Sequence, residues 1–569
     1  MTLEPWHLTT DVLVIGAGGA GMYAAIEAAR GGADVLLADR ALIGRGGATV
    51  MAMMTVAVAL GDAAPDDAAF HLADTLTAGR GLCNADLARL LCEEGPNCIR
   101  EMDDWGVGWA REGDAIKSAH APGHDRPRCV YVDFLNTGPA VSKTLRKVLH
   151  QHDDKVRRVG DLMIIDLVKT DGVVTGAVAV EISSGRPVTI AAGATIIATG
   201  GLTRLYRRSS ASFNMGGDGY ALALRAGARL IDMEFVQFFP IGHLAPRLIG
   251  LDPIMWDPFR YKLGGRLLNG DMEEFTDRYG TSEDGRYVIT RDAATYAITK
   301  EVAAGRGSPA GGAFLSFEHL SEAELEAAFG PVIKKLKTNG IDLTQMPIEV
   351  SPIAHYHMGG VAVDTEMATD VAGLFAAGEA VGGANGANRL SGNAITEALV
   401  FGKRAGRSAA QYVAQLTERP AIDTSDAGST LDLVQADTAA TTTRNTAAMI
   451  AELQAAMSDH AGPFKTEASL GRALAAIADL EGRLGTEPPG RPDTFDPQRV
   501  DWFDLRNMLL VARVVVEAAL TRTESRGAHQ REDYPGMLDD WRCNQFAELH
   551  AGQPTITRGP MLARPETAA

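Results

Sequence analysis

The chain has 569 residues, a length that corresponds to roughly three to four domains and argues against a single small binding module. With 46% hydrophobic and 22% charged residues, the composition is that of a protein with large buried cores, which a disordered chain cannot form. The 72 acidic residues outnumber the 54 basic ones, and the net charge of -18 repels phosphate backbones and anionic lipids. We therefore expect neither nucleic-acid binding nor membrane insertion.

The cysteines and the first residues indicate the compartment. Five cysteines without CxxC spacing argue against a disulfide framework and against an iron-sulphur or zinc site, so we predict no metal site on this chain. The start, MTLEPWHLTTD, lacks the basic and apolar regions of a signal peptide, and the apolar run at 50–60 is too short to cross a bilayer. We expect a cytoplasmic protein.

The first predicted unit is a strand, a tight turn, a helix and a second strand near the N-terminus. An apolar run at 11–15 is typical of a short buried strand, and GAGGAG follows at 16–21. Small residues predict a helix over 20–30, and a second apolar run predicts a strand over 34–38. This order is that of a βαβ unit.

The glycine-rich turn and the acid after the second strand predict a dinucleotide site. The glycines allow a tight turn and the close approach of a pyrophosphate to the helix N-terminus. They are Gly16, Gly18, Gly19 and Gly21. Asp39 closes the second strand, where a ribose hydroxyl needs an acceptor. The position at the start of the chain favours FAD over a mobile nicotinamide.

Two later segments also run from a strand into glycines. They are GATIIATGG at 193–201 and TDVAGLFAAGEAVGG at 369–383. Each could be an ordinary strand end. Together with the first junction they predict a single parallel sheet assembled from distant segments, with a ligand at the carboxyl ends of its strands.

The last third of the chain is predicted to be helical. Apolar residues recur at steps of three and four, as one buried helix face requires. They are Leu470, Leu474, Ile477, Leu480 and Leu484. A second long helix is predicted over 501–523. Segments rich in Pro, Gly and Asp at 418–430 and 485–497 are typical of connectors.

Several motifs resemble one known family. They include NMGGDGYALALRAGARLIDMEFVQF from 214, AHYHMGGVAVD from 354, GEAVGGANGANRLSGNAITEALVFG from 378 and TRTESRGAHQREDYP from 521. In these motifs and their order the chain resembles the flavoprotein subunit of succinate dehydrogenases and fumarate reductases, the FAD-dependent oxidoreductase 2 family. L-aspartate oxidase and the adenylylsulfate reductase flavoprotein are relatives.

The resemblance implies an α/β fold with a Rossmann-like FAD-binding domain, an inserted α+β capping domain and a C-terminal helical domain. The implied boundaries are 1–234 and 351–415 for the FAD-binding domain, 235–350 for the capping domain, 416–440 for a linker, 441–545 for the helical domain and 546–569 for a tail.

The resemblance also implies three catalytic residues. Arg389 matches the arginine that binds a substrate carboxylate, and a planar guanidinium can form two parallel charge-assisted hydrogen bonds. His355 matches the histidine at the same end of the substrate, with a structural hydrogen-bonding role as the alternative. Arg291 matches the arginine that passes the proton, and the alternative is a pair with Asp292 at a helix N-terminus.

The expected substrate pocket departs from the pattern of the family. Where the family has QFHPTG this chain has QFFPIG, so Phe239 replaces the histidine that binds the second carboxylate. The segment MWDPFRYKLGG at 255–265 lacks a clear counterpart of the threonine and glutamate at that end and places Trp256 nearby. Leaving a carboxylate against aromatic walls costs on the order of several kcal/mol. We expect a substrate with one carboxylate, not a standard C4 dicarboxylate.

Two further residues are assigned to this pocket with alternatives. Arg260, or Lys262, could bind a second anion from a new direction, which would weaken the argument from Phe239. His357 stands where relatives often carry another polar residue, so it contacts either the substrate or the protein interior.

The flavin is expected to be noncovalent. Membrane-bound relatives attach FAD through a histidine in a segment resembling RSHTVAAQGG, whereas the corresponding residues 44–49 read GRGGAT. The remaining cofactor contacts implied by the resemblance are Gly47, Ala48, Thr49, Thr199, Gly200, Asp218, Glu379, Asn388, Ala394 and Ile395.

The sequence thus predicts an FAD-dependent oxidoreductase that transfers a hydride between flavin N5 and a carbon-carbon bond beside a substrate carboxylate. One alternative is an amino-acid oxidase resembling L-aspartate oxidase. A second is a flavin subunit whose task is to dock an iron-sulphur or ferredoxin-like electron-transfer partner, since the chain carries no cysteine cluster of its own.

Overall fold

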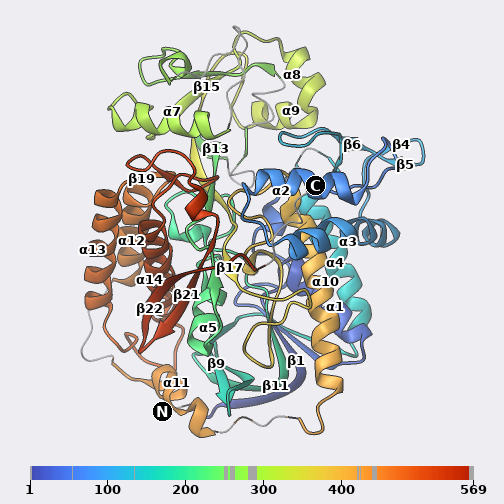
Figure 1. Cartoon of the computed structure of the whole chain (residues 1–569), viewed down its shortest axis with the longest axis vertical. Helices are drawn as coiled ribbons and strands as arrows, with labels where there is room; N and C mark the ends of the chain where they lie inside the picture. The colour runs from blue at the N-terminus through green and yellow to red at the C-terminus, as the bar shows by residue number, and fades with distance from the viewer. Residues whose placement is uncertain are drawn as a thin grey trace. The chain divides into compact units, whose positions relative to one another are not determined.

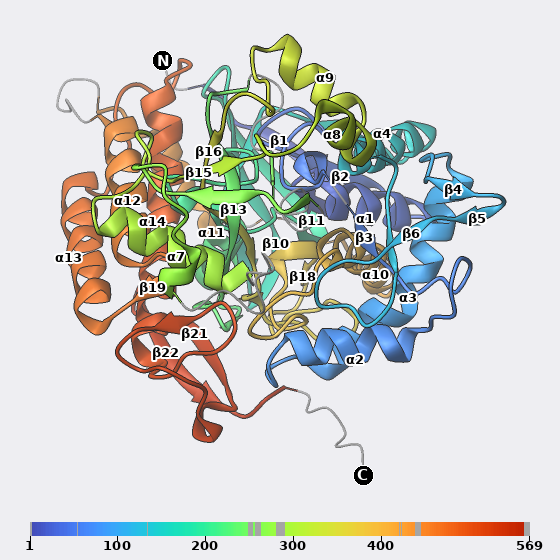
Figure 2. The same ribbon diagram turned by 90° about the horizontal axis from the view of Figure 1, so that it is seen from above.

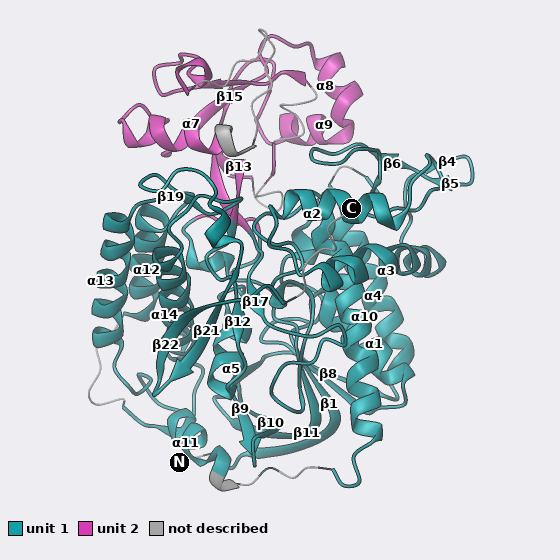
Figure 3. Cartoon of the chain, viewed as in Figure 1, with its two compact units in different colours: residues 1–207, 211–236, 356–569 teal, residues 208–210, 237–355 magenta. Residues whose placement is uncertain are grey.

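The computed structural model of the chain describes residues 3–53, 55–133, 135–248, 254–256, 263–279, 291–419, 422, 424–438 and 445–562. The chain forms two compact units (Figure 3). Unit 1 comprises residues 1–207, 211–236 and 356–569, and unit 2 comprises residues 208–210 and 237–355.

A seven-stranded sheet forms the centre of unit 1. Its strands lie in the order β8-β2-β1-β11-β10-β9, and β18 pairs with β11. Their bounds are β1 (Trp6–Ile15), β2 (Val35–Ala38), β8 (Val156–Val159), β9 (Leu162–Thr170), β10 (Val173–Glu181), β11 (Pro187–Ile197) and β18 (Leu374–Ala376). The adjacent ends of β1, β2, β11 and β18 are buried on both faces, as their continuous apolar runs require.

The sheet is mixed rather than wholly parallel. Strands β8, β2, β1, β11 and β18 are parallel, so the three strand-to-glycine junctions of the sequence do meet in one sheet. Strands β9, β10 and β11 are instead joined by short connections, which allow only antiparallel pairing between neighbours.

Two helices that are far apart in the sequence pack side by side. They are α1 (Gly19–Arg30) and α10 (Asn393–Ala414), blue and orange in Figure 1. A Cβ at Gly402 would lie 2.5 Å from the carbonyl oxygen of Ala20, and one at Gly406 would overlap the carbonyl oxygen of Ala24. The two helix backbones are therefore in direct contact, which only glycine permits.

Further helices of unit 1 are α2 (Ala68–Ala78), α3 (Ala85–Asp104), α4 (Thr137–Leu149), α5 (Asp218–Ala226), α11 (Thr424–Gln435), α12 (Thr446–His460), α13 (Glu467–Leu484) and α14 (Pro497–Thr521). The last three pack together, as Figure 2 shows from above. The predicted apolar face of α13 is buried, although Leu474 is only half-buried. Helix α11 lies within the segment expected to be a linker.

The end of the chain adds strands that the sequence did not indicate. Strands β21 (Asn544–His550) and β22 (Gln553–Gly559) form a hairpin that joins β12 (Leu230–Ile231) and β17 (Gly360–Val361) in one sheet. Leu230 pairs with Ala547, so the partner comes from more than 300 residues earlier in the chain. The hairpin pattern alone does not reveal such a partner.

Unit 2 is built on a four-stranded sheet in the order β13-β16-β15-β14. Its strands are β13 (Val236–Ala245), β14 (Arg266–Leu268), β15 (Ala313–Ser316) and β16 (Ile348–His357), and its long helices are α7 (Arg291–Ala303), α8 (Glu322–Phe329) and α9 (Pro331–Thr338). The chain enters on β13 and returns on β16, which is its neighbour in the sheet. Unit 2 is therefore an insertion within unit 1. No helix in the described ranges is long and apolar enough to cross a bilayer.

Candidate active site

The loop between β1 and α1 contains glycines that the fold itself requires and one that it does not. Gly16 has φ +99°, and a Cβ there would lie 2.5 Å from the carbonyl oxygen of Ala198. A Cβ at Gly21 would overlap the carbonyl oxygen of Gly16. At Gly18 the φ of -73° suits any residue and a Cβ would meet no atom within 4 Å. The open space at Gly18, before a helix N-terminus, fits a diphosphate.

A second loop lies against this glycine turn. The backbone N–H of Gly19 donates to Thr49 Oγ1 at 3.2 Å. Gly47 has φ +83° and open space at its Cβ position, and its N–H donates to Ser212 Oγ at 2.6 Å. Ala48 stands between Gly47 and Thr49 and caps a short 3-10 turn over Thr49–Met51. Residues 47–49 thus bring backbone atoms close to the glycine turn and carry no bulky side chains.

Asp39 ties the glycine turn to β2. One carboxylate oxygen accepts the N–H of Ala17 at 2.7 Å and the other accepts the N–H of Ala41 at 2.8 Å. Burial raises the pKa of Asp39, and these two hydrogen bonds oppose that rise. The carboxylate therefore supports the turn from within the protein, and its expected contact with a ribose stays a prediction.

The end of β11 provides a buried polar atom suited to a ligand. Thr199 Oγ1 is buried and has no hydrogen-bond partner among the described residues. Gly200 follows with φ +73°. A buried hydroxyl without a partner is costly, so a polar group of a bound molecule at this position would stabilise it. These features fit a dinucleotide along the carboxyl ends of the parallel strands.

Asp218 begins α5 inside a network of charges. It accepts from Arg40 Nη1 at 3.4 Å and from Asn507 Nδ2 at 3.2 Å. Burial and the nearby carboxylate of Asp504 raise the pKa of Asp218, and Arg40 lowers it. The charge of Asp218, which is expected to contact the cofactor, therefore depends on residues of helix α14.

Arg389 is buried just before α10. It is 6% exposed, its guanidinium lies 4.5 Å from the ring centre of Tyr356, and Nη1 donates to the carbonyl oxygen of Leu390 at 3.2 Å. Asn388 is half-buried beside it, and Ala394 and Ile395 lie in the first turn of α10. Amides of a first turn have no partner within the helix, so this end of α10 suits an electron-rich ligand.

Two buried carboxyls lie in the electrostatic field of Arg389. Glu379 Oε1 accepts the N–H of His357 at 3.1 Å, and burial raises its pKa to about 7. Glu397 accepts from the hydroxyl of Tyr356 and from Asn385 Nδ2, and burial raises its pKa to about 8. Arg389 lowers the pKa of both. Sequence reasoning named Glu379 and missed Glu397.

His357 has the contacts of an interior residue. It is 0% exposed, its Nδ1 lies 3.1 Å from the hydroxyl of Tyr220, and its Nε2 lies 3.1 Å from the carbonyl oxygen of Met233. Burial lowers its pKa to about 4, so the ring is neutral. Of its two alternatives, the structural role has the support of these contacts, and we leave His357 out of the proposed substrate contacts.

In unit 2, His355 stands beside a hydroxyl and an aromatic ring. Its Nδ1 lies 2.7 Å from Ser210 Oγ, and its ring meets Phe239 edge to face with centroids 5.5 Å apart. Phe239 packs with Met255 and Ile353 in a buried apolar cluster. A hydrocarbon surface thus adjoins His355. Sequence reasoning missed Ser210, because 145 residues separate the two and no local pattern joins them.

The other residues expected in unit 2 differ in their setting. Trp256 is 0% exposed and its indole N–H donates to His243 Nδ1 at 3.0 Å, which places it in the core of the unit. We therefore leave Trp256 out of the proposed substrate contacts as well. Arg291 is the first residue of α7. Arg260 lies outside the described residues.

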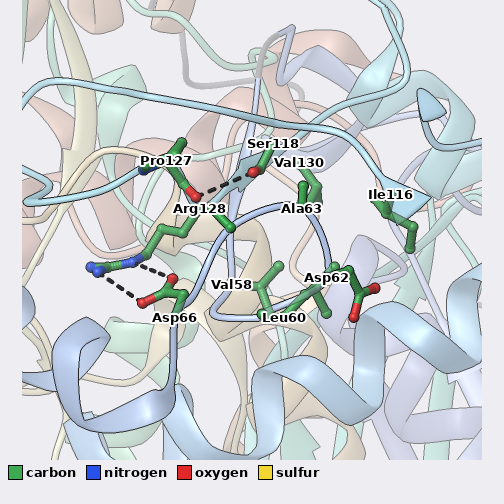
Figure 4. Close-up of a pocket in the computed structure, with 12 residues that line it drawn as sticks. Val58, Leu60, Asp62, Ala63, Asp66, Ile116, Ser118, Pro127, Arg128 and Val130 are labelled. Carbon is green, nitrogen blue, oxygen red and sulfur yellow. Dashed lines mark hydrogen bonds and ion pairs between the residues drawn. The ribbon is translucent and has the colours of Figure 1, made fainter. Parts of the chain in front are cut away.

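A separate small pocket in unit 1 carries no sign of a ligand site. Figure 4 shows Arg128 extending towards Asp66, with which it forms an ion pair at 3.0 Å. Arg128 also pairs with Asp125 at 2.6 Å, so its charge is neutralised inside the protein. The wall includes Val58, Leu60, Ala63, Ile116 and Val130, and none of the residues expected in the active site lines it.

Comparisons with known proteins agree with this geometry. Residues 11–395 match the sequence family described as FAD binding domain, and residues 450–565 match that of the fumarate reductase flavoprotein C-terminus. The chain is 34% identical over 537 residues to one of the subunits of the fumarate reductase (CoM/CoB) of Methanothermobacter marburgensis, covering 94% of this chain and 96% of that protein. It is 32% identical over 567 residues to L-aspartate oxidase of Streptomyces coelicolor, covering 96% and 92%. The solved structure of Mycobacterium smegmatis Sdh1 has a TM-score of 0.90 at 34% identity, covering 98% and 95% of the two chains.

The glycine turns, the sheet and these matches define an FAD-dependent oxidoreductase. The chain belongs to the fumarate reductase and succinate dehydrogenase flavoprotein family. The predictions of FAD as cofactor and of a Rossmann-like FAD-binding domain with an inserted cap and C-terminal helices are confirmed.

Proposed function

We propose that this protein catalyses reduction or formation of a carbon-carbon double bond beside a substrate carboxylate. The observation that carries the proposal is the guanidinium of Arg389, which is 6% exposed and lies 4.5 Å from the ring centre of Tyr356. A buried guanidinium with this setting binds a carboxylate strongly, because the anion supplies both charge and hydrogen-bond acceptors.

Bound FAD supplies the acceptor or donor of a hydride. On this proposal Arg389 and His355 hold the substrate carboxylate and stabilise the negative charge that develops on it. Ser210 orients the ring of His355 through the 2.7 Å contact at Nδ1. Arg291 is proposed to exchange the proton with the neighbouring carbon, a role that requires surroundings that disfavour its charge.

The residues proposed to hold FAD noncovalently are those of the three strand-to-glycine junctions and of the first turn of α10. Gly18 leaves room for the diphosphate. The buried hydroxyl of Thr199 can form a hydrogen bond with a polar group of FAD. The full proposed set is Gly16, Gly18, Gly19, Gly21, Asp39, Gly47, Ala48, Thr49, Thr199, Gly200, Asp218, Glu379, Asn388, Ala394 and Ile395.

The proposed substrate carries one carboxylate rather than two. Phe239, with Met255 and Ile353, places hydrocarbon beside His355 at the position where the family has a histidine. A second carboxylate in contact with this cluster would lose its hydration without gaining a donor. An uncharged or bulkier group at that end of the substrate fits better.

Two other functions have specific support. The relative from Streptomyces coelicolor is named L-aspartate oxidase, so release of hydrogen peroxide on mixing with amino acids would favour an oxidase. The relative from Methanothermobacter marburgensis is named as one subunit of its enzyme, which supports an iron-sulphur or ferredoxin-like partner for electron transfer. Copurification of such a chain would support that role, and turnover by the isolated chain would show that the partner is dispensable.

The test compares two acceptors that differ at one end only. The bound flavin is reduced anaerobically and then mixed with fumarate or with its monomethyl ester, and reoxidation is followed by absorbance. We expect the monoester to reoxidise the flavin faster than fumarate. Faster reoxidation by fumarate would overturn the argument from Phe239, and failure of both, with every other unsaturated acid tried, would overturn the reaction class.

The same assay tests Arg389. R389A is expected to lose turnover by about 100-fold or more, because a charge-assisted clamp on the reacting acid is removed. Its flavin absorbance should remain, since Arg389 is not in the proposed cofactor set. Loss of the yellow colour would instead assign Arg389 to the cofactor site.

A further inference from the structure

Helix α14 of the C-terminal helical domain packs closely against the turn that begins α5. A Cβ at Gly216 would lie 3.2 Å from Met508 Cγ. Gly217 has φ +88°, and a Cβ there would lie 3.0 Å from Val511 Cγ1. Side chains of α14 therefore lie directly on the backbone of this turn, an approach that glycine permits at no steric cost.

Asn507 is the polar residue of α14 at this contact, and one of its two polar atoms lacks a partner. The residue is 2% exposed, and its Nδ2 donates to Asp218 Oδ1 at 3.2 Å. Because Asp218 accepts here and also accepts from Arg40, the amide nitrogen faces the carboxylate and Oδ1 is the atom left over. Within the part of the chain that the structure describes, this buried Oδ1 has no hydrogen-bond partner. Such an oxygen is costly, which points to a bound group that donates to it.

The end of β11 borders the same first turn of α5. A Cβ at Gly219 would overlap Thr199 Oγ1, so this hydroxyl lies directly against the backbone of α5. Thr199 Oγ1 is likewise buried without a partner among the residues described. Two such oxygens, one from β11 and one from α14, thus adjoin a helix N-terminus whose first N–H groups have no partner within the helix. Together they indicate a ligand at this position.

The neighbouring charges connect this position to the adenosine end of FAD. Arg40 directly follows Asp39, the residue expected to bind a ribose at the end of β2. Arg40 Nη1 donates to Asp218 at 3.4 Å, and Arg40 Nη2 donates to Asp504 at 2.8 Å. Asp504 lies three residues before Asn507 on α14. The expected ribose position and Asn507 therefore share Arg40 as a neighbour.

An amide oxygen can only accept a hydrogen bond, so the group that meets it must be a donor. In the adenosine half of FAD the phosphate oxygens and the ring nitrogens of adenine are acceptors, whereas the ribose hydroxyls and the adenine amino group are donors. We propose that Asn507 is a cofactor-binding residue contributed by the C-terminal helical domain, and that its Oδ1 accepts a hydrogen bond from one of these donors. The inference concerns how FAD is held, so it is independent of the proposed substrate and of the direction of the reaction.

The experiment compares FAD with analogues that each lack one donor. Folded apoprotein is titrated with FAD and with its 2′-deoxyribose, 3′-deoxyribose and purine analogues, and quenching of flavin fluorescence gives each dissociation constant without turnover. We expect one analogue to bind the wild type about tenfold more weakly than FAD, because one buried hydrogen bond is lost. That analogue identifies the donor. Equal binding of FAD and all three analogues by the wild type would overturn the proposal, whatever the variants show.

Two substitutions assign the lost hydrogen bond to Asn507. N507L removes the amide at similar volume, so it should bind FAD about tenfold more weakly but bind the identified analogue as the wild type does, since that hydrogen bond is already absent. N507D keeps an oxygen acceptor and should still bind FAD more tightly than the analogue. An equal loss in N507L for FAD and for all three analogues would show that Asn507 acts on the fold alone and would overturn the proposal.

N544L is the matched control. Asn544 is also 2% exposed and its Nδ2 donates to the buried Asp232 at 2.6 Å, but its Oδ1 accepts the N–H of Leu562 at 3.2 Å. N544L should lower the urea midpoint of the apoprotein and leave the ratio of the dissociation constants of FAD and the analogue at its wild-type value. If N544L abolished this ratio as N507L does, the effect would come from general damage, and the assignment of Asn507 would be wrong.

Discussion

At the scale of single residues, the loop between β1 and α1 separates glycines needed for folding from a glycine needed for a ligand. Gly21 has the oxygen of Gly16 where its side chain would be, whereas Gly18 has open space and an ordinary φ. A methyl group at the two positions therefore has different consequences, although the two glycines stand three residues apart in one motif.

G18A is expected to fold as wild type and to bind FAD at least about tenfold more weakly, because its methyl group would occupy space that the diphosphate approaches. G21A is expected to destabilise the apoprotein, because its methyl group would overlap a backbone oxygen. Apoprotein unfolding and FAD titration by fluorescence measure the two effects. G471A, on an exposed turn of α13 with open space, is the control and should lower neither. Normal FAD affinity in G18A would contradict the assignment.

The glycine turn could be predicted from sequence because its residues are contiguous and stand between an apolar strand pattern and a helix pattern. Arg389 could be predicted only through a family motif. Glu397 lies eight residues further on, and its partner Tyr356 is 41 residues away in sequence. Which buried acid meets which phenol depends on how α10 packs against the end of β16, and no spacing rule expresses that.

At the scale of elements, one buried carboxylate on helix α14 forms ion pairs with arginines of the FAD-binding domain. Asp504 accepts from Arg40 Nη2 at 2.8 Å and from Arg204 Nη1 at 2.6 Å. Arg40 follows β2, and it also contacts Asp218 at the start of α5. The carboxylate side chain is 1% exposed, so both ion pairs are shielded from water. The C-terminal helices thus support residues around the proposed FAD site.

D504N is expected to lower the free energy of unfolding by about 3 kcal/mol, because two arginines in a buried network lose their anionic partner. D501N is the matched control on the same helix. Asp501 is 26% exposed and lies 3.7 Å from Arg204, so its loss should cost less than about 1 kcal/mol. Urea unfolding of the holoprotein measures both. Equal costs in the two variants would show that burial of Asp504 does not determine its contribution.

At the scale of the whole molecule, the proposed FAD contacts come from segments spread between Gly16 and Asn507, all within unit 1. A ligand held by many separate segments stabilises all of them together. The loop at 44–49 contains no histidine to which FAD could be attached. Both features concern how the cofactor is retained.

Acid precipitation is expected to leave a colourless pellet and a yellow supernatant, because noncovalent FAD is released when the fold is lost. Adding FAD back to refolded apoprotein should raise the free energy of unfolding by about 2.7 kcal/mol at a hundredfold excess over the dissociation constant. Supernatant absorbance and thermal unfolding with and without FAD are the measurements. Yellow protein in the washed pellet would contradict noncovalent binding.

The sequence alone predicted the order of the main parts, but not how the chain closes its sheets. The βαβ unit and the amphipathic face of α13 follow from local periodicity. The mixed sheet arises because β9, β10 and β11 follow one another through short connections, whereas the pairing of the hairpin β21–β22 depends on a partner hundreds of residues away, Leu230 for Ala547. Contacts between residues so far apart in the sequence leave no periodic pattern in composition or spacing.

The route of the chain through unit 2 has a consequence for diversification. Because β13 and β16 are neighbours in one sheet, the two ends of the inserted segment are adjacent in space. A segment with adjacent ends can be exchanged between related proteins as a cassette with two short junctions. Grafting residues 237–355 from a relative would replace Phe239 and His355 together with the strands that carry them, while every residue proposed to retain the flavin stays unchanged.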